Sequence, residues 1–251
     1  MEIEMKRLVL ALGIALSSLN AVAQQAFDGF NVQLGIGGTQ SQVKATNTED
    51  LSLDNPPNIN KTTTGTSFNG LASIGYSQSF DNLFKGFNLA GNVFYVIGNQ
   101  SAGNSNMTTI SSRPITETLT GKYKLQNTWG ISIEPGYYFS KNILGYLKFA
   151  YVSSTLNSSF TCNADDNNCL SPGGSLGENA AFTTNKTING IGYGIGGKYQ
   201  ITKDIYGALD FLYVDYSKAS QTLTWYDSSY STNAGFKPQQ VMGFISIGYR
   251  F

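Results

Sequence analysis

The stretch that decides the fold is GIGYGIGGKYQI, residues 190–201. Ile191, Tyr193 and Ile195 share one parity in it, and glycines occupy the positions between them. A period of two indicates a β-strand with one apolar face, because successive side chains of a strand point to opposite sides. The stretch therefore predicts a strand with large apolar side chains on one face and almost none on the other.

The same stretch formally matches the dinucleotide-binding fingerprint through Gly192-x-Gly194-x-x-Gly197. That fingerprint needs a helix N-terminus directly after the glycine-rich turn, to hold the pyrophosphate. Here the alternation continues through Tyr199 and Ile201. We interpret the glycines instead as small residues that fill the inner face of a narrow barrel.

Alternation of this kind returns in seven further segments, which brings the expected number of strands to eight. The seven segments are 30–36, 68–76, 87–97, 129–139, 147–151, 209–213 and 241–251. No apolar run after residue 23 reaches 18 residues, so a helical membrane span is not expected.

The connections between these strands differ in length at the two ends. Three are short, at 80–85, 140–144 and 202–204. Four are long and polar, at 43–65, 98–117, 156–185 and 218–237. Short turns at one end and long loops at the other are typical of outer-membrane barrels, and aromatic residues near the short turns fit an interfacial girdle. The expected fold is an all-β, eight-stranded antiparallel up-and-down transmembrane barrel; a secreted β-sandwich would leave glycine and asparagine lining its second face.

The N-terminus has the features of a signal peptide. Lys6 and Arg7 precede the apolar run 8–16, and the small-x-small sequence 21–23 predicts cleavage after Ala23. The expected division is a signal peptide over 1–23 and a barrel domain with four long external loops over 24–251. Met5 would give a more ordinary leader than Met1, and the sequence does not decide between the two starts.

Composition excludes several classes of function. The 251 residues contain no histidine, 16 basic and 16 acidic side chains, and only 13% charged residues. Without histidine, Ser-His-Asp and Cys-His nucleophile systems and most zinc sites are absent. A net charge of zero without a basic run argues against nucleic-acid binding. We therefore expect no enzyme activity, no cofactor and no metal.

Two further segments carry a family resemblance. The hairpin over 190–216 and the ending ISIGYRF, residues 245–251, resemble the small OmpA-like and opacity-type outer-membrane barrels. The resemblance implies residence in the outer membrane of a Gram-negative bacterium after export through the periplasm. It also implies that the barrel-assembly machinery reads the C-terminal residues Tyr249 and Phe251. The sequence ends at the last barrel strand, so the peptidoglycan-binding domain of OmpA itself is not expected.

Cys162 and Cys169 lie in the longest of the predicted loops. Because export implies an oxidising compartment, we expect a local disulfide between them. The intervening run Asp165-Asp166-Asn167-Asn168 offers oxygen ligands for calcium, but it lacks the EF-hand pattern, and we interpret it as a solvated turn.

Charged residues with inward parity form the most informative group. If the two strands that flank each short turn pair in antiparallel fashion, Glu134 lies opposite Lys148, and Lys198 lies almost opposite Asp210. Arg250 also has inward parity. Since an unpaired charge in a narrow lumen is strongly destabilising, we predict that these five residues form a polar core that plugs the barrel. A glycosidase-type pair of carboxylates is the catalytic alternative, but each acid here has a base as its neighbour.

The expected function is a non-enzymatic one. Loops on a rigid scaffold usually carry specificity, so the chain is predicted to stabilise the envelope and to present surface loops to a surface or host ligand. The alternative is a small porin-like channel for passive diffusion of small solutes. Familiar barrel enzymes of the outer membrane share the architecture but rely on histidine, which this chain lacks.

Overall fold

The computed structural model describes residues 26–49, 61–110, 116–163, 181–224 and 231–251, which form ten β-strands. The strands are β1 (Gly29–Glu49), β2 (Lys61–Ser79), β3 (Phe87–Ile97), β4 (Gln100–Ile110), β5 (Thr116–Ser140), β6 (Ile143–Asn163), β7 (Ala181–Gln200), β8 (Ile205–Tyr216), β9 (Ala219–Thr224) and β10 (Ser231–Arg250). No helix in these ranges is both long and apolar enough to cross a membrane.

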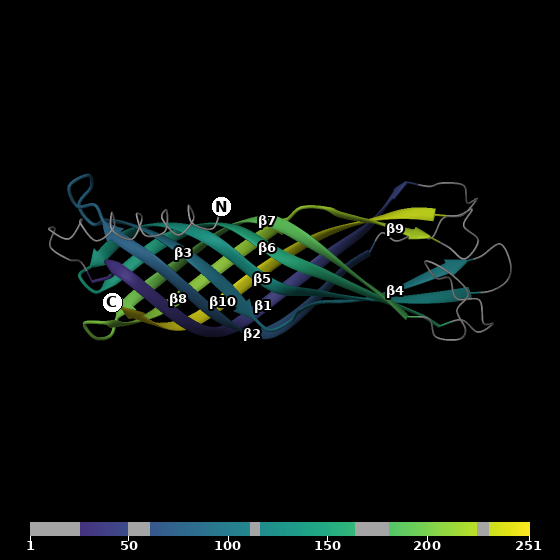
Figure 1. Cartoon of the computed structure of the whole chain (residues 1–251), viewed down its shortest axis with the longest axis horizontal. Helices are drawn as coiled ribbons and strands as arrows, with labels where there is room; N and C mark the ends of the chain where they lie inside the picture. Colours follow the sequence, from purple (N-terminus) through teal and green to yellow (C-terminus); the bar gives the residue numbers. More distant parts are fainter. Residues whose placement is uncertain (1–25, 50–60, 111–115, 164–180, 225–230) are drawn as a thin grey trace, which may run out of the picture.

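Eight of these strands close into a ring. The antiparallel order is β1-β2-β3-β5-β6-β7-β8-β10, and β10 pairs back with β1. Val32 lies opposite Tyr249 at this closure, and Ala45 lies opposite Phe236 farther along the same pair of strands. The predicted eight-stranded up-and-down barrel is therefore confirmed (Figure 1).

The two remaining strands continue the wall of the barrel. β4 pairs with β5 as β3 does, and β9 pairs with β10 as β8 does. The break between β3 and β4 falls at Gly98, whose φ of 103° favours glycine. The Nδ2 atom of Asn69 donates to the carbonyls of Ile97 and Asn99 at 3.3 Å and so holds both sides of the break.

The strands extend much farther than the sequence predicted. The segments 43–49 and 61–65, expected as loop, belong to β1 and β2. Likewise, the expected loop 98–117 contains the whole of β4. The prediction relied on apolar alternation, which stops where the outer surface becomes polar, although the backbone pairing continues. In Figure 1 this extension, with β4 and β9, lies at the end away from the C-terminus.

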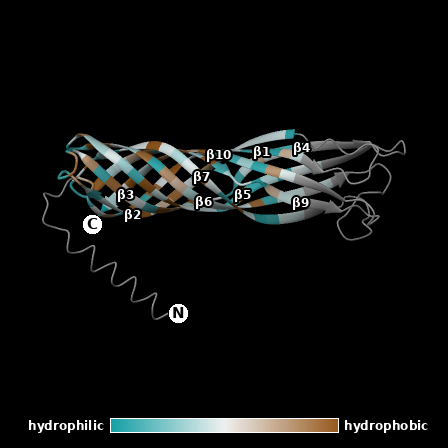
Figure 2. Cartoon of the chain, turned by 90° about the horizontal axis from the view of Figure 1, so that it is seen from above, coloured by the Kyte–Doolittle hydropathy of each residue, from teal (hydrophilic) through white to brown (hydrophobic). Residues whose placement is uncertain are grey.

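The outer face of the ring carries a belt of exposed apolar side chains. On β5 it runs from Trp129 to Phe139, which is about the 9 to 11 residues that a tilted strand needs to cross a bilayer core. Ile131 and Ile133 are more than half exposed within it, although they are large and apolar. Figure 2 shows the hydrophobic residues gathered mainly in the half of the barrel that ends in the short turns.

Candidate functional site: the interior of the barrel

The interior is filled with side chains whose chemistry changes along the barrel. The inward residues of β8 lie in successive layers of this filling, from the short-turn end toward the loop end. Tyr206 lies at the mouth, Asp210 in a charged cluster, Leu212 and Val214 in an apolar layer, and Tyr216 in a layer of hydrogen-bonded amides.

The charged cluster joins four of the five predicted residues. Lys148 Nζ lies 3.0 Å from Glu134 Oε1 and 2.8 Å from Asp210 Oδ1, so this lysine bridges the two carboxylates. The Nζ atom of Lys198 lies 3.4 Å from Glu134 Oε2. All four side chains are buried, and two cations balance two anions. Every charge is thus compensated inside the wall, as a buried ion requires.

The pairing within the cluster differs in part from the prediction. Glu134 and Lys148 do face each other, because Ile133 pairs with Phe149 on one side and Gly136 with Tyr146 on the other.

Lys198 does not pair with Asp210. Its partner in the sheet is Ala208, and Asp210 faces Gly196. The turn is centred one residue earlier than expected, since the amides of Ile201 and Thr202 both donate to the carbonyl of Ile205.

Arg250 lies outside the cluster, which corrects the prediction of a five-residue core. Its Nη2 atom donates to the carbonyl of Lys203 at 3.0 Å and lies 3.8 Å from Asp204 Oδ1. Arg250 ends the last strand, level with the β7–β8 turn, so its side chain reaches that turn rather than the middle of the lumen. It contributes to the short-turn mouth of the barrel.

Neutral side chains that the sequence analysis did not single out complete the cluster. The Tyr146 hydroxyl donates to Asp210 Oδ1 at 2.8 Å, and Gln33 Nε2 donates to Asp210 Oδ2 at 3.1 Å. Lys198 Nζ lies 5.1 Å from the centre of the Tyr146 ring and 5.7 Å from that of Tyr206, within cation–π distance. The inward parity of both tyrosines was the signal that could have identified them.

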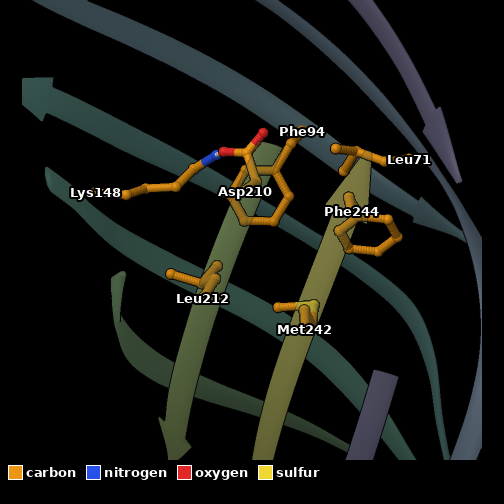
Figure 3. A pocket seen from close by; sticks show the side chains of 7 residues that line it. All are labelled: Leu71, Phe94, Lys148, Asp210, Leu212, Met242 and Phe244. Atoms are coloured by element: carbon orange, nitrogen blue, oxygen red, sulfur yellow. Dashed lines mark hydrogen bonds and ion pairs between the residues drawn. The ribbon is translucent and has the colours of Figure 1, made fainter. Parts of the chain in front are cut away.

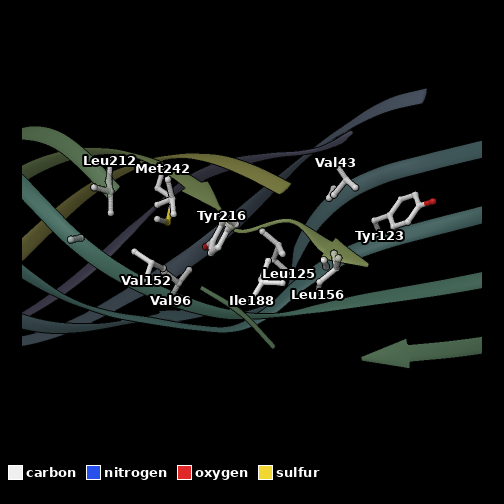
Figure 4. Close-up of a cluster of buried hydrophobic side chains, with 14 of the residues drawn as sticks. Val43, Val96, Tyr123, Leu125, Val152, Leu156, Ile188, Leu212, Tyr216 and Met242 are labelled. Atoms are coloured by element: carbon white, nitrogen blue, oxygen red, sulfur yellow. The ribbon is translucent and has the colours of Figure 1, made fainter. Parts of the chain in front are cut away.

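An apolar layer lies next to the charged cluster. Figure 3 shows Lys148 and Asp210 beside Phe94, Leu212, Met242 and Phe244, around a void of about 20 Å³. Figure 4 shows how the apolar cluster continues through Val152, Val96 and Ile188 to Leu125 and Tyr123. The inward charged residues predicted a polar lumen, so this apolar layer was not expected from the sequence. The available signal was the loss of alternation at the ends of β3 and β8, where both faces become apolar.

A hydrogen-bonded layer crosses the lumen beyond Val214. The Nε2 atom of Gln240 donates to Gln100 Oε1 and to Ser41 Oγ, both at 3.1 Å. Thr128 donates to the same Gln100 oxygen at 2.7 Å, and Tyr216 donates to Gln240 Oε1 at 3.0 Å. These residues come from β1, β4, β5, β8 and β10, so the layer ties together walls of the barrel that are not neighbours.

The short-turn mouth is covered by the residues just before β1. Phe27 is buried between Tyr138 and Tyr206, with ring centroids 5.8 and 5.9 Å away. Its backbone N–H donates to the Tyr138 hydroxyl at 3.2 Å. Gly29 then turns the chain into the wall with a φ of 115°. The N-terminal segment therefore forms the first layer of the filling.

The other predicted residues lie on the outside or beyond what the structure describes. Tyr249 and Phe251 point outward, 44% and 71% exposed, with their rings 5.0 Å apart. The side chains of Cys162 and Cys169, predicted to form a disulfide, fall outside the described part, as does the predicted signal peptide. Among the described residues, no group of three or more Cys, Asp or Glu side chains is placed to hold a metal ion.

No protein-family model matches the chain, and neither does any curated protein.

Among solved structures, the chain is similar to Ail, the attachment invasion locus protein of Yersinia pestis, at 14% identity over 89% of this chain and 99% of that one (TM-score 0.33). Neisserial surface protein A matches at 14% identity over 89% and 98% (TM-score 0.37). The outer membrane protease OmpT from Escherichia coli matches at 11% identity over 92% and 99% (TM-score 0.39). By its own closed ring and apolar belt, the chain has the architecture of the small outer-membrane β-barrels.

Proposed function

We propose that this protein is a non-enzymatic barrel of the bacterial outer membrane that closes its own lumen and holds its long connections at the cell surface. The observation that carries the proposal is the filling of the lumen by four successive layers, from Phe27 to the Gln100–Gln240 contact. A solute would have to break compensated ion pairs and a cross-lumen hydrogen-bond layer to pass.

The same filling argues against the small porin-like channel. A porin keeps a polar, water-filled interior. Here the middle of the barrel is apolar, and the void beside Lys148 and Asp210 has room for about one water molecule.

Catalysis has little support in the interior. Glu134 and Asp210 share Lys148 as a partner, which holds both carboxylates in ion pairs rather than leaving one available as an acid. Histidine is absent from the whole sequence. The cluster is therefore best explained as a structural one.

The surface role rests on the extension of the barrel. Beyond the apolar belt, β1 and β10 stay paired as far as Glu49 and Asn233, so the wall of the barrel continues past the part that faces lipid. We propose that the long connections bind a surface or host ligand, and that the barrel-assembly machinery recognises Tyr249 and Phe251 during insertion from the periplasm.

Liposome swelling tests the closed barrel, and a deletion tests the surface role. Liposomes with the purified protein should swell in small sugars no faster than protein-free liposomes; rapid swelling would support the channel instead. Cells that carry a variant without residues 164–180 should lose binding to host cells or matrix and keep their permeability. Unchanged binding together with raised permeability would contradict the proposed role.

A further inference from the structure

Where the outer surface changes from apolar to polar, four neighbouring strands form a hollow of about 190 Å³. It lies over β2, β1, β10 and β8 and faces away from the lumen. Its lining includes Gln40, Gln42, Thr64, Tyr213, Gln239 and Val241. Gln240, which belongs to the hydrogen-bonded layer inside the barrel, also contributes to the lining, whereas the six outward side chains take no part in that layer.

The strand register shows how the hollow is built. The outward row next to it on the side of the short turns is Phe68, Gly38, Gly243 and Phe211, in the order of the four strands. Phe68 is 76% exposed and Phe211 49%, and the two glycines between them carry no side chain. A Cβ added to Gly38 would meet no atom within 4 Å, so the space over it is open. The Phe211 ring leans over Gly243, since a Cβ added there would lie 3.2 Å from it, so the open apolar space is the one over Gly38, between Phe68 and the Phe211 ring.

The next two rows toward the loop end supply hydrogen-bonding groups. Gln40 lies opposite Val241, and Gln42 lies opposite Gln239. A carboxamide both donates and accepts, which matches the double character of a sugar hydroxyl. Tyr213 borders these amides and adds an aromatic ring.

A pair of lysines forms the next outward row toward the loop end, beyond the residues that line the hollow. Lys44 lies directly opposite Lys237, and both belong to the outward face. Lys237 Nζ lies 3.0 Å from Asp215 Oδ2, whereas Lys44 has no acidic partner among the described residues. Within the described part of the chain, this row therefore carries one positive charge without an acidic partner.

We propose that this hollow, together with the outward rows on either side of it, binds an anionic glycolipid of the outer membrane leaflet, with an acyl chain over Gly38, sugar hydroxyls against the glutamines and a phosphate at Lys44 and Lys237. This inference rests on the order of the rows. Along the strands an apolar row is followed by an amide row and then by a cationic row, which is the order of the acyl chains, sugars and phosphate groups in such a lipid. The inference rests on the proposed membrane location, and it does not depend on whether the lumen conducts.

Native mass spectrometry of the purified barrel in detergent, titrated with lipid A, tests the proposal. The wild type should retain lipid A, and retain it better than dephosphorylated lipid A or phosphatidylglycerol. Lys44→Ala combined with Lys237→Ala should weaken lipid A binding at least tenfold. Gly38→Leu should weaken it as well by filling the open apolar space, and it needs no rearrangement of the fold.

Two matched variants control for changes in surface charge and bulk. Lys122→Ala with Lys124→Ala removes two exposed cations of β5, and Gly91→Leu fills an outward position of β3 whose nearest atom is 4.0 Å away. Both should bind lipid A like the wild type.

Equal retention of lipid A and phosphatidylglycerol, or equal loss in test and control variants, would overturn the proposal. Swelling of liposomes would refute the closed lumen and leave this result unaffected, so the two failures are distinguishable.

Discussion

Gln100 and Gln240 meet inside the barrel, with Nε2 of Gln240 donating to Oε1 of Gln100 at 3.1 Å across 140 positions of sequence. The first residue opens β4 and the second lies in β10, and β1 and β2 separate the two in the ring. Side chains therefore span the lumen and connect walls of the barrel that are not neighbours.

Removing the bridging cation should destabilise the barrel strongly. Lys148→Ala leaves Asp210 without an ion-pair partner in the cluster and Glu134 with Lys198 alone, and we expect it to lower the free energy of unfolding by about 3 to 5 kcal/mol. Urea unfolding in lipid vesicles measures the change. Lys237→Ala is the control, because its exposed pair with Asp215 contributes no more than about 1 kcal/mol. Equal losses of unfolding free energy in the two variants would show that the buried cluster contributes no more to stability than an exposed ion pair.

A methyl group at Gly196 should also destabilise the barrel. The added Cβ would collide with the ring of Tyr146, the residue whose hydroxyl donates to Asp210. Overpacking of this kind costs about 1 to 3 kcal/mol. Gly38→Ala adds the same group in open space and should be close to neutral. A neutral Gly196→Ala in the same unfolding assay would mean that the ring moves aside freely.

Truncation of Phe27 should weaken the short-turn end. Phe27→Ala removes a buried ring with two aromatic neighbours, and we expect a loss of about 3 kcal/mol. Tyr138→Phe removes only the hydroxyl that accepts from the Phe27 amide and should cost about 1 kcal/mol. If Phe27→Ala had no effect on unfolding, the N-terminal segment would not be part of the filling.

Much of this arrangement could be predicted from the sequence, and the exceptions have physical causes. Alternation identifies the strands of the belt because lipid demands apolar side chains on one face, as in Ile191, Tyr193 and Ile195. It fails above the belt, where water on the outside accepts polar side chains on a paired strand. It also fails for Leu212 and Val214, since an inward apolar residue resembles an outward one when the register of the ring is unknown.

The charged cluster inside the barrel could also be predicted only in part. Reflection about a tight turn identifies Glu134 and Lys148, because both flank the same hairpin. Contacts between strands that are not sequential neighbours, such as Gln33 with Asp210, depend on how the ring closes. No local pattern records that closure, and a shift of one residue in the β7–β8 turn was enough to separate Lys198 from Asp210.

The paired extension of the barrel predicts slow amide exchange beyond the apolar belt. Residues 41–46 pair with β10 on one side, and 41–45 with β2 on the other. Hydrogen exchange of the barrel in detergent should therefore show protected amides in this segment. Amide exchange as fast as in a free peptide would contradict this pairing and would support the longer loop that the sequence predicts.

Phe251 should matter for assembly more than for stability. Its side chain is 71% exposed and packs mainly on Tyr249, so Phe251→Ala should leave the unfolding free energy within about 1 kcal/mol of wild type. In cells, the same variant should lower the amount of barrel in the outer membrane severalfold. Normal assembly of Phe251→Ala would remove the proposed role of the C-terminal aromatic residue.

Single-channel recording in a planar bilayer tests the central claim, a lumen closed by its own side chains, most directly. The purified wild-type protein, shown to be folded by its β-sheet circular dichroism, should give no large and stable conductance steps. Replacing Gln100, Gln240, Phe94 and Phe244 together with alanine should raise the frequency of openings if the folded barrel survives. Large, stable conductance from the wild type would contradict the account.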